Sequence, residues 1–226
     1  MPDTTDKHAR YSRAERLSDA VVHVAGLSLV LMAVPVLIVV TALQRGDVLS
    51  LTGVSIYGGA LFAMIFCSAL YNMSQNLDWG AAREWLFKRL DHSAIYVKIA
   101  GTYTPFTLLS GHGMALTVGL WGAALTGVAL KLICPWRFRW LGLALYLGMG
   151  WAGVLAGQAL LAALPLPVVV LMVVGGGLYT GGVIFYLWEK LPFHNTIWHG
   201  FVLVASLVFY AAVLTYVVIG GDVVAG

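Results

Sequence analysis

Side chains that can bind a metal or move a proton occur in four short stretches of an otherwise apolar chain. Asp19 and His23 are four residues apart, and the same spacing separates Ser68 from Asn72. Residues four apart share one face of a helix, and polar groups inside a membrane are costly and usually face the interior of a bundle. The candidate pocket residues are Asp19, His23, Ser68, Asn72, Asp91, His92, Lys98, His194, Asn195 and His199.

Some of these polar residues could occur there simply because they lie near the ends of the predicted helices. Side chains near helix ends can reach the hydrated headgroups, and this alternative stays open for Asp19, His92 and His194 taken singly. For the whole set it is weaker, because four predicted helices bring their polar groups to the same depth. We therefore expect one polar site at that depth.

Lys98 is a separate case, since it lies about two helical turns from Asp91 and near the middle of the membrane. We expect its ammonium to be satisfied by a carbonyl that Pro105 frees, or by a hydroxyl of the neighbouring threonines. The alternative is that Lys98 supplies positive charge above the polar residues.

The elements that position these residues are predicted from composition. The chain has 226 residues, of which 60% are apolar and only 10% charged, and its mean hydropathy is +0.88. Soluble proteins average about 45–50% apolar and about 25% charged residues, so the composition indicates a membrane protein. Two cysteines give no disulfide framework, and a net charge of +3 does not suggest a nucleic-acid partner.

Seven apolar runs are long enough to cross a hydrocarbon core, which needs about 20 helical residues. The first run is too long for the apolar region of a signal peptide, so we take it as an uncleaved helix. The sequence predicts an all-α protein with seven transmembrane helices, at about residues 20–43, 54–73, 92–109, 114–132, 141–164, 168–188 and 196–219.

The positive charges predict how the chain is oriented. Eleven of the thirteen Lys and Arg residues precede the first span or follow the second, fourth and sixth; Arg45 lies on the opposite side and Lys98 within a span. Cytoplasmic segments carry the excess of such residues. We expect a cytoplasmic tail at residues 1–18, a membrane domain at 19–219 and an external tail at 220–226, with the polar site at the cytoplasmic end.

Four motifs resemble the haemolysin III family of bacterial membrane proteins, part of the progestin and adipoQ receptor superfamily. The family has Glu, Asn and His where this chain has Glu15, Asp19 and His23. The other motifs are Ser68-x3-Asn72, which resembles Ser-x3-His; residues 90–96 (LDHSAIY) with 100–106 (AGTYTPF); and residues 191–199 (LPFHNTIWH), which resemble His-x3-His.

This resemblance implies a zinc ion held by three histidines, with the Ser and Asp (here Ser68 and Asp91) orienting a water molecule. Asn72 and Asn195 replace two of the three histidines, and an amide is a poor zinc ligand. Of the three implied zinc-ligand positions, only that of His199 holds a histidine in this chain. If a metal binds, we expect His199 to hold it, with His194 and His23 as substitute ligands. Zinc is the one cofactor that the resemblance implies.

Three functions follow as hypotheses. The preferred one is a non-enzymatic protein of the bacterial inner membrane that binds a lipid or serves membrane homeostasis, with a degenerate or absent zinc site. The second is a zinc-dependent hydrolase of a lipid amide or ester, resembling the ceramidases. The third is a pore-forming or haemolytic protein, which the confinement of charge to one end disfavours. Membrane lipids are the expected partners; protein partners and enzymatic activity stay open.

Overall fold

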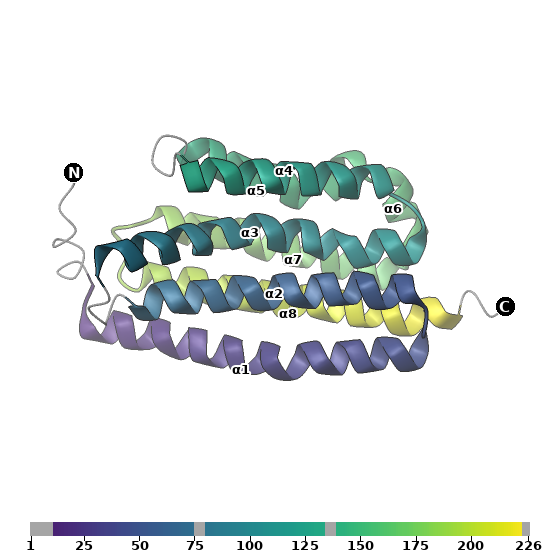
Figure 1. Ribbon diagram of the computed structural model, residues 1–226, viewed down its shortest axis with the longest axis horizontal. Coiled ribbons are helices and arrows are strands. Elements are labelled where there is room, and N and C mark those ends of the chain that lie inside the picture. The colour runs from purple at the N-terminus through teal and green to yellow at the C-terminus, as the bar shows by residue number, and fades with distance from the viewer. Residues whose placement is uncertain (1–10, 75–79, 134–138, 223–226) are drawn as a thin grey trace.

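A computed structural model describes residues 11–74, 80–133 and 139–222 of the chain. These residues form eight helices and no strand, which confirms the predicted all-α class (Figure 1). The ends of the two predicted tails, residues 1–10 and 223–226, lie outside the described residues. The helices are α1 (Arg13–Gln44), α2 (Val48–Ser74), α3 (Ala81–Ser110), α4 (Met114–Ile133), α5 (Arg139–Ala156), α6 (Gln158–Ala163), α7 (Leu166–Leu187) and α8 (His194–Asp222).

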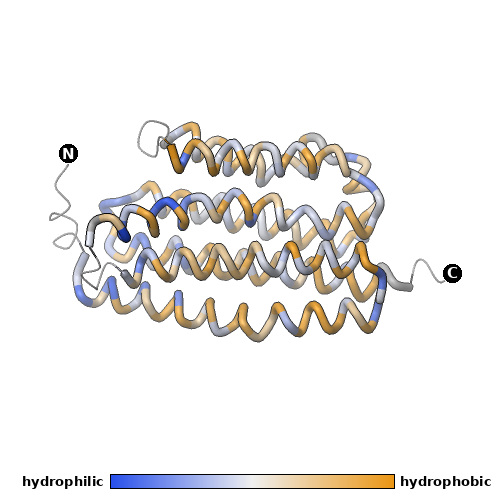
Figure 2. The backbone as a smooth tube through the Cα atoms, viewed as in Figure 1, coloured by the Kyte–Doolittle hydropathy of each residue, from blue (hydrophilic) through white to orange (hydrophobic). Residues whose placement is uncertain are grey.

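Five of these helices are long and apolar enough to cross a membrane: α1, α2, α4, α7 and α8. A sixth apolar stretch, Trp140–Leu155 in α5, is shorter. Figure 2 shows that hydrophilic residues gather near the helix ends while the middles are largely apolar. Large apolar side chains such as Leu31, Met32 and Leu125 are exposed on the outer surface, as expected for a surface that faces lipid.

All the long helices run along one axis, so their ends meet at two ends of the bundle (Figure 1). Helix α2 packs on α3, α7 packs on α8, and α1 contacts both α2 and α8. Apart from Lys98, the polar residues predicted to form the site lie at the end where α1, α3 and α8 begin and α2 ends. We call this end the polar end.

The fifth predicted span, residues 141–164, is interrupted. Helix α5 ends at Ala156 and the short α6 begins at Gln158, with Gly157 between them at φ −102° and ψ 31°. A Cβ atom at Gly157 would lie 2.4 Å from the carbonyl oxygen of Gly153, so this irregularity requires glycine. Hydropathy cannot detect such a break, because glycine does not interrupt an apolar run.

The third helix is longer than predicted, since it begins at Ala81 rather than near residue 92. Its added turns carry Arg83, Glu84, Lys88 and Arg89, whose charges led to a prediction of a loop. These turns extend the helix beyond the apolar part of the bundle, where charged side chains are tolerated.

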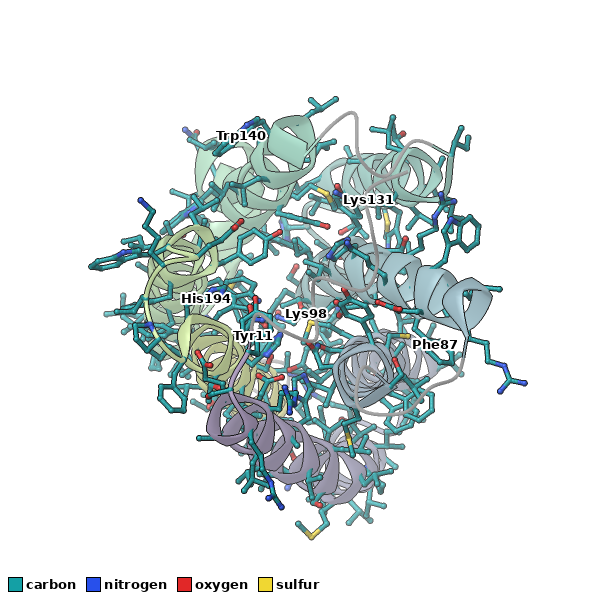
Figure 3. All side chains as sticks on the ribbon, turned by 90° about the vertical axis from the view of Figure 1, so that its left-hand side faces the viewer. Tyr11, Phe87, Lys98, Lys131, Trp140 and His194 are labelled. Carbon is teal, nitrogen blue, oxygen red and sulfur yellow. The ribbon has the colours of Figure 1, made fainter. Side chains whose placement is uncertain are left out.

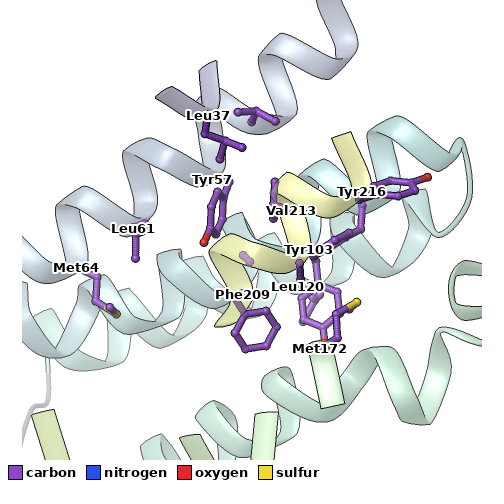
Figure 4. Packing of buried hydrophobic residues seen from close by; sticks show 14 of the residues in the cluster. Leu37, Tyr57, Leu61, Met64, Tyr103, Leu120, Met172, Phe209, Val213 and Tyr216 are labelled. Carbon is purple, nitrogen blue, oxygen red and sulfur yellow. The ribbon is translucent and has the colours of Figure 1, made fainter. Parts of the chain in front are cut away.

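The core between the helices is formed mainly by buried aromatic and aliphatic side chains (Figure 4). Tyr57 and Val213 are almost completely buried. Helices α2 and α3 approach closely at Gly101, where a Cβ atom would lie 2.7 Å from the Cβ of Ala60. This contact sets the distance between α2 and α3, and thereby the separation of Ser68 and Asp91 at the polar end.

Candidate functional site

A network of hydrogen bonds ties the start of α1 to the start of α8. Ser12 and Glu15 form a capping box at the N-terminus of α1, an arrangement that satisfies otherwise unpaired backbone N–H groups. The second carboxylate oxygen of Glu15 accepts a hydrogen bond of 2.9 Å from the backbone N–H of Phe193. Ser18 and Thr196 share a further bond of 2.9 Å between their hydroxyls. The two helix starts are thus held together, and Asp19 lies one turn beyond Glu15.

Asp19, His23 and His199 form a compact group of ionisable side chains. Nδ1 of His199 lies 2.6 Å from Oδ1 of Asp19. Nδ1 of His23 lies 2.8 Å from the backbone oxygen of Asp19 and 3.5 Å from its Oδ2. The two imidazole rings meet edge to face at a centroid separation of 4.4 Å. Asp19 is 9% and His23 5% exposed.

Ser68 joins this group to α2 and α3. Its hydroxyl lies 3.1 Å from Nε2 of His23 and also interacts with the carboxyl group of Asp91. The side-chain amide of Asn72 donates to the backbone oxygen of Ser68 at 2.9 Å and approaches its hydroxyl at 3.4 Å. Asn72 therefore binds its own helix.

His194 lies apart from the Asp19–His23–His199 group. Its Nε2 is 3.2 Å from the hydroxyl of Tyr11, while its Nδ1 is buried without a hydrogen-bond partner among the described residues. The imidazole is only 4% exposed. Of the two substitute ligands predicted for a metal, the structure therefore places His23 beside His199 and His194 elsewhere.

A cavity of about 540 Å³ extends from the polar end into the bundle. Figure 3 views the bundle from this end and shows Tyr11, His194 and Lys98 around its middle. Helices α1, α2, α3, α5, α7 and α8 all contribute to its wall. Every predicted pocket residue except Asp19 lines this cavity: His23, Ser68, Asn72, Asp91, His92, Lys98, His194, Asn195 and His199. Asp19 contacts the cavity-lining His23 and His199.

Two kinds of surface form the wall. At the polar end it carries Trp85, Lys88, Arg89, Lys131 and Glu189, and farther in it carries apolar and aromatic side chains that include Ile99, Leu147, Trp151, Val202 and Phe209. The cavity is thus charged and mainly basic at one end and largely apolar beyond it. Proteins bind small molecules in cavities of about 300–1,000 Å³ with such mixed walls.

Lys98 is 3% exposed and lines the apolar part of the cavity. Its Nζ lies 4.2 Å from the ring centroid of Tyr179 and 4.7 Å from that of Phe209. A desolvated cation–π contact contributes about 2 kcal/mol, whereas burying an ammonium costs several kcal/mol. The predicted bond to a carbonyl or a threonine hydroxyl does not occur among the described residues; the Thr102 hydroxyl instead donates to the backbone oxygen of Lys98 at 2.7 Å.

Sequence reasoning missed the aromatic residues of this site. Tyr179 lies in α7, which holds none of the predicted pocket residues. Its hydroxyl bonds Ser206 at 2.7 Å, and its ring covers Lys98. Tyr11 precedes the first helix and has no motif to mark it.

The side chains present allow a test of whether zinc fits. At the positions that the resemblance assigns to ligands, Asn72 and Asn195 offer amides, which do not suit zinc. Asp19, His23 and His199 offer one carboxylate and two imidazoles, whose ligand atoms all lie within 4.8 Å of one another. These are zinc donors, and two histidines with one carboxylate are a known catalytic set. The Asp19–His23–His199 group therefore fits a metal ion, whereas the ligand positions that the resemblance implies do not.

Comparisons with known proteins agree with the motifs. The protein family described as haemolysin-III related matches residues 12–210. The chain is 37% identical over 209 residues to the Hemolysin-3 homolog of Bacillus subtilis (strain 168), which covers 90% of this chain and 95% of that protein. It is 35% identical over 218 residues to Hemolysin-3 of Bacillus cereus, which covers 94% and 97%. The Homo sapiens protein Monocyte to macrophage differentiation factor is 27% identical over 169 residues, which cover 71% and 68%.

Proposed function

Because this chain belongs to the haemolysin III related family, we propose that it is a multi-pass membrane protein that binds a lipid in the cavity at its polar end. The observation that carries this proposal is the cavity itself, a space of about 540 Å³ with a charged end and a largely apolar wall. A lipid has the same two parts. Apolar surface in the cavity would pack against an acyl chain, and the charged and polar side chains of the wall would bind a headgroup.

The proposal includes a topology. Helices α1, α2, α3, α4, α7 and α8 each make one pass, and α5 together with α6 makes another, so the chain crosses the membrane seven times. The polar end is cytoplasmic, because the basic residues concentrate there, and the membrane is the bacterial inner membrane. Helix α3 crosses despite its charges because its neighbours surround Lys98.

Ligand-dependent stability tests lipid binding. A ligand present at about 100 times its Kd stabilises the folded state by about 2.7 kcal/mol, so bacterial polar lipids should raise the Tm of the detergent-purified protein. Gly150 lines the cavity, and a Cβ atom there would meet nothing within 4 Å. We expect Gly150→Phe to fill the cavity and abolish the lipid-dependent shift.

Gly148 offers the matched control. It lies on the same helix and is exposed, and a Cβ atom added there would also meet nothing within 4 Å. Gly148→Phe should therefore keep the shift in Tm. An equal lipid response in both variants and in the wild type would mean that lipid acts on the outer surface, and would refute binding in the cavity.

A second function is favoured by the Asp19–His23–His199 group, namely metal-dependent hydrolysis of a lipid amide or ester. Bound zinc supplies a Lewis acid and lowers the pKa of water. The motif of this family has Asn at the position of Asp19, so this chain carries a carboxylate there, while amides stand at two of the three implied histidine positions, Asn72 and Asn195. Ser68 contacts His23, and Asp91 interacts with Ser68, so these two side chains would orient a water molecule or a substrate carbonyl.

Activity measurements decide between the two functions. Purified protein supplied with zinc would be assayed on a lipid amide and on a lipid ester of the same chain length. Turnover that His199→Gln abolishes would establish the hydrolase, and the absence of turnover in zinc-loaded protein would exclude it. The third hypothesis, a pore-forming protein, stays a prediction, and a measurement of conductance in reconstituted vesicles would test it.

A further inference from the structure

We propose that Lys98 is an anion-binding residue and that the lipid in the cavity is a single-chain lipid whose carboxylate pairs with the Lys98 ammonium. This inference rests on the proposed lipid binding and names the chemical class of the ligand. It concerns the apolar part of the cavity, away from the Asp19–His23–His199 group.

The first argument is that Lys98 is buried without a counter-charge. The side chain is 3% exposed and lines the cavity, and among the described residues no charged group acts on its ammonium. Asp91, on the same helix, interacts with Ser68 and His199 instead. A buried ammonium either loses its proton or gains a counter-charge, and the cavity is the place where an anion can reach it.

The second argument concerns hydrogen bonds. An ammonium has three donors and no acceptor, and the rings of Tyr179 and Phe209 occupy part of its surroundings at 4.2 and 4.7 Å. Rings attract the cation but do not replace an anionic acceptor. The Tyr179 hydroxyl is already bonded to Ser206. Among the described residues no acceptor is bonded to the ammonium, so a ligand in the cavity supplies one.

The third argument selects a carboxylate. One ammonium balances one negative charge, and no arginine of the described residues reaches this part of the wall. A phosphate monoester carries about −1.5 to −2 at pH 7 and would leave charge uncompensated in an apolar surrounding. A phosphodiester carries a single charge, as a carboxylate does, but it has a second ester substituent that would also have to be buried, whereas a carboxylate ends its alkyl chain. Lys88, Arg89 and Lys131 at the polar end favour the approach of an anionic amphiphile. Apolar walls around Lys98 suit the alkyl chain attached to the carboxylate.

Paired probes test the inference. Equilibrium binding of radiolabelled oleate and oleamide to the detergent-purified protein compares one chain with and without the negative charge. We expect the wild type to bind oleate at least about tenfold more tightly than oleamide, a difference of about 1.4 kcal/mol. Lys98→Met should weaken oleate binding by a similar factor and leave oleamide binding nearly unchanged, while Lys98→Arg should retain the preference for oleate.

Lys190→Met is the matched control, because Lys190 is exposed in the segment between α7 and α8 and does not line the cavity. It should bind both probes as the wild type does. If Lys98→Met does not give a monodisperse folded protein, the preference of the wild type and of Lys98→Arg decides the matter: a preference of about tenfold supports the inference and none overturns it.

The outcomes separate this inference from the proposed function. Equal binding of oleate and oleamide by the wild type, or unchanged oleate binding by folded Lys98→Met, overturns the role of Lys98 and leaves lipid binding intact. Failure of both probes to bind overturns lipid binding and this inference with it. Competition by acetate as effective as by oleate would show a site for small anions and overturn the lipid assignment.

Discussion

At the scale of single residues, Asp19 organises the polar end by accepting hydrogen bonds from two histidines. A carbonyl oxygen only accepts hydrogen bonds, so Nδ1 of His23 carries a proton and donates it to the backbone oxygen of Asp19. Nδ1 of His199 likewise donates to the carboxylate. These bonds leave Nε2 of each ring as the deprotonated atom in the neutral form, and Nε2 of His23 accepts from Ser68. Metal ligation requires such a deprotonated nitrogen.

The first prediction concerns which residues hold zinc. We expect the detergent-purified wild type to retain zinc, and Asp19→Asn and His23→Gln each to lower the retained amount at least about tenfold, as loss of groups that hold or orient a metal does. Elemental analysis measures the ratio of zinc to protein.

Two substitutions serve as controls for this prediction. Asn72→Ala should keep the metal, because the Asn72 amide binds its own helix, and His194→Gln should also keep it. A wild type without zinc, or a loss of zinc in Asn72→Ala as large as in Asp19→Asn, would contradict the assignment of Asp19, His23 and His199.

At the scale of the helices, the contact between α2 and α3 sets the spacing of the polar end. The second prediction is that Gly101→Ala lowers the free energy of unfolding by about 1–3 kcal/mol, the usual cost of overpacking. The added Cβ would meet the Cβ of Ala60, which cannot rotate away. Thermal unfolding in detergent measures the loss.

Gly59→Ala is the control on the neighbouring helix, because a Cβ atom there meets nothing within 4 Å. It should leave stability unchanged or raise it by up to about 1 kcal/mol, since alanine favours a helix over glycine. Equal effects of the two substitutions would show that α2 and α3 are not in close contact at Gly101.

The start of α2 supports a third prediction. Oδ1 of Asp47 accepts a hydrogen bond of 2.8 Å from the backbone N–H of Ser50, and hydrogen bonds from Ser50 hold the pKa of Asp47 below its ordinary value of 3.8. Removing such a cap costs about 1 kcal/mol. Asp47→Ala should therefore lower the Tm at neutral pH.

The pH dependence of this cap follows from the sign of the shift. Because the pKa of Asp47 is lowered in the folded protein, its stabilisation is present above about pH 4 and is lost as the pH falls through the folded-state pKa. The difference in Tm between wild type and Asp47→Ala should shrink in that range. Asp47→Asn keeps a capping side chain without the charge, so its Tm relative to Asp47→Ala should not depend on pH in this way.

At the scale of the whole molecule, the fourth prediction is that the two ends of the chain lie on opposite sides of the membrane. In intact bacterial cells, and with Cys67 and Cys134 replaced by serine, a membrane-impermeant maleimide should label a cysteine added after Gly226 and should not label one introduced at Ser12. Both sites should react after the cells are permeabilised. Labelling of both or of neither in intact cells would require an even number of passes.

Composition and local residue spacing were sufficient to predict the helical class, the long apolar helices and the family. Asp19 and His23 could be placed on one face from their spacing, since a helix repeats about every 3.6 residues. The break at Gly157 and the extension of α3 to Ala81 could not be predicted, because the first depends on a backbone conformation and the second on where charged turns leave the bundle.

The sequence by itself therefore determined that four helices carry polar groups at one depth, because depth follows from the number of residues along each helix. Only the tertiary structure decided which of those groups touch. The packing of α1 against α8 brings His199 to Asp19, and the turn before α8 directs His194 to Tyr11. Tyr179 of α7 and Phe209 of α8 cover Lys98 of α3 with aromatic rings. Such contacts depend on helix rotation and separation, and residues distant in the chain set both.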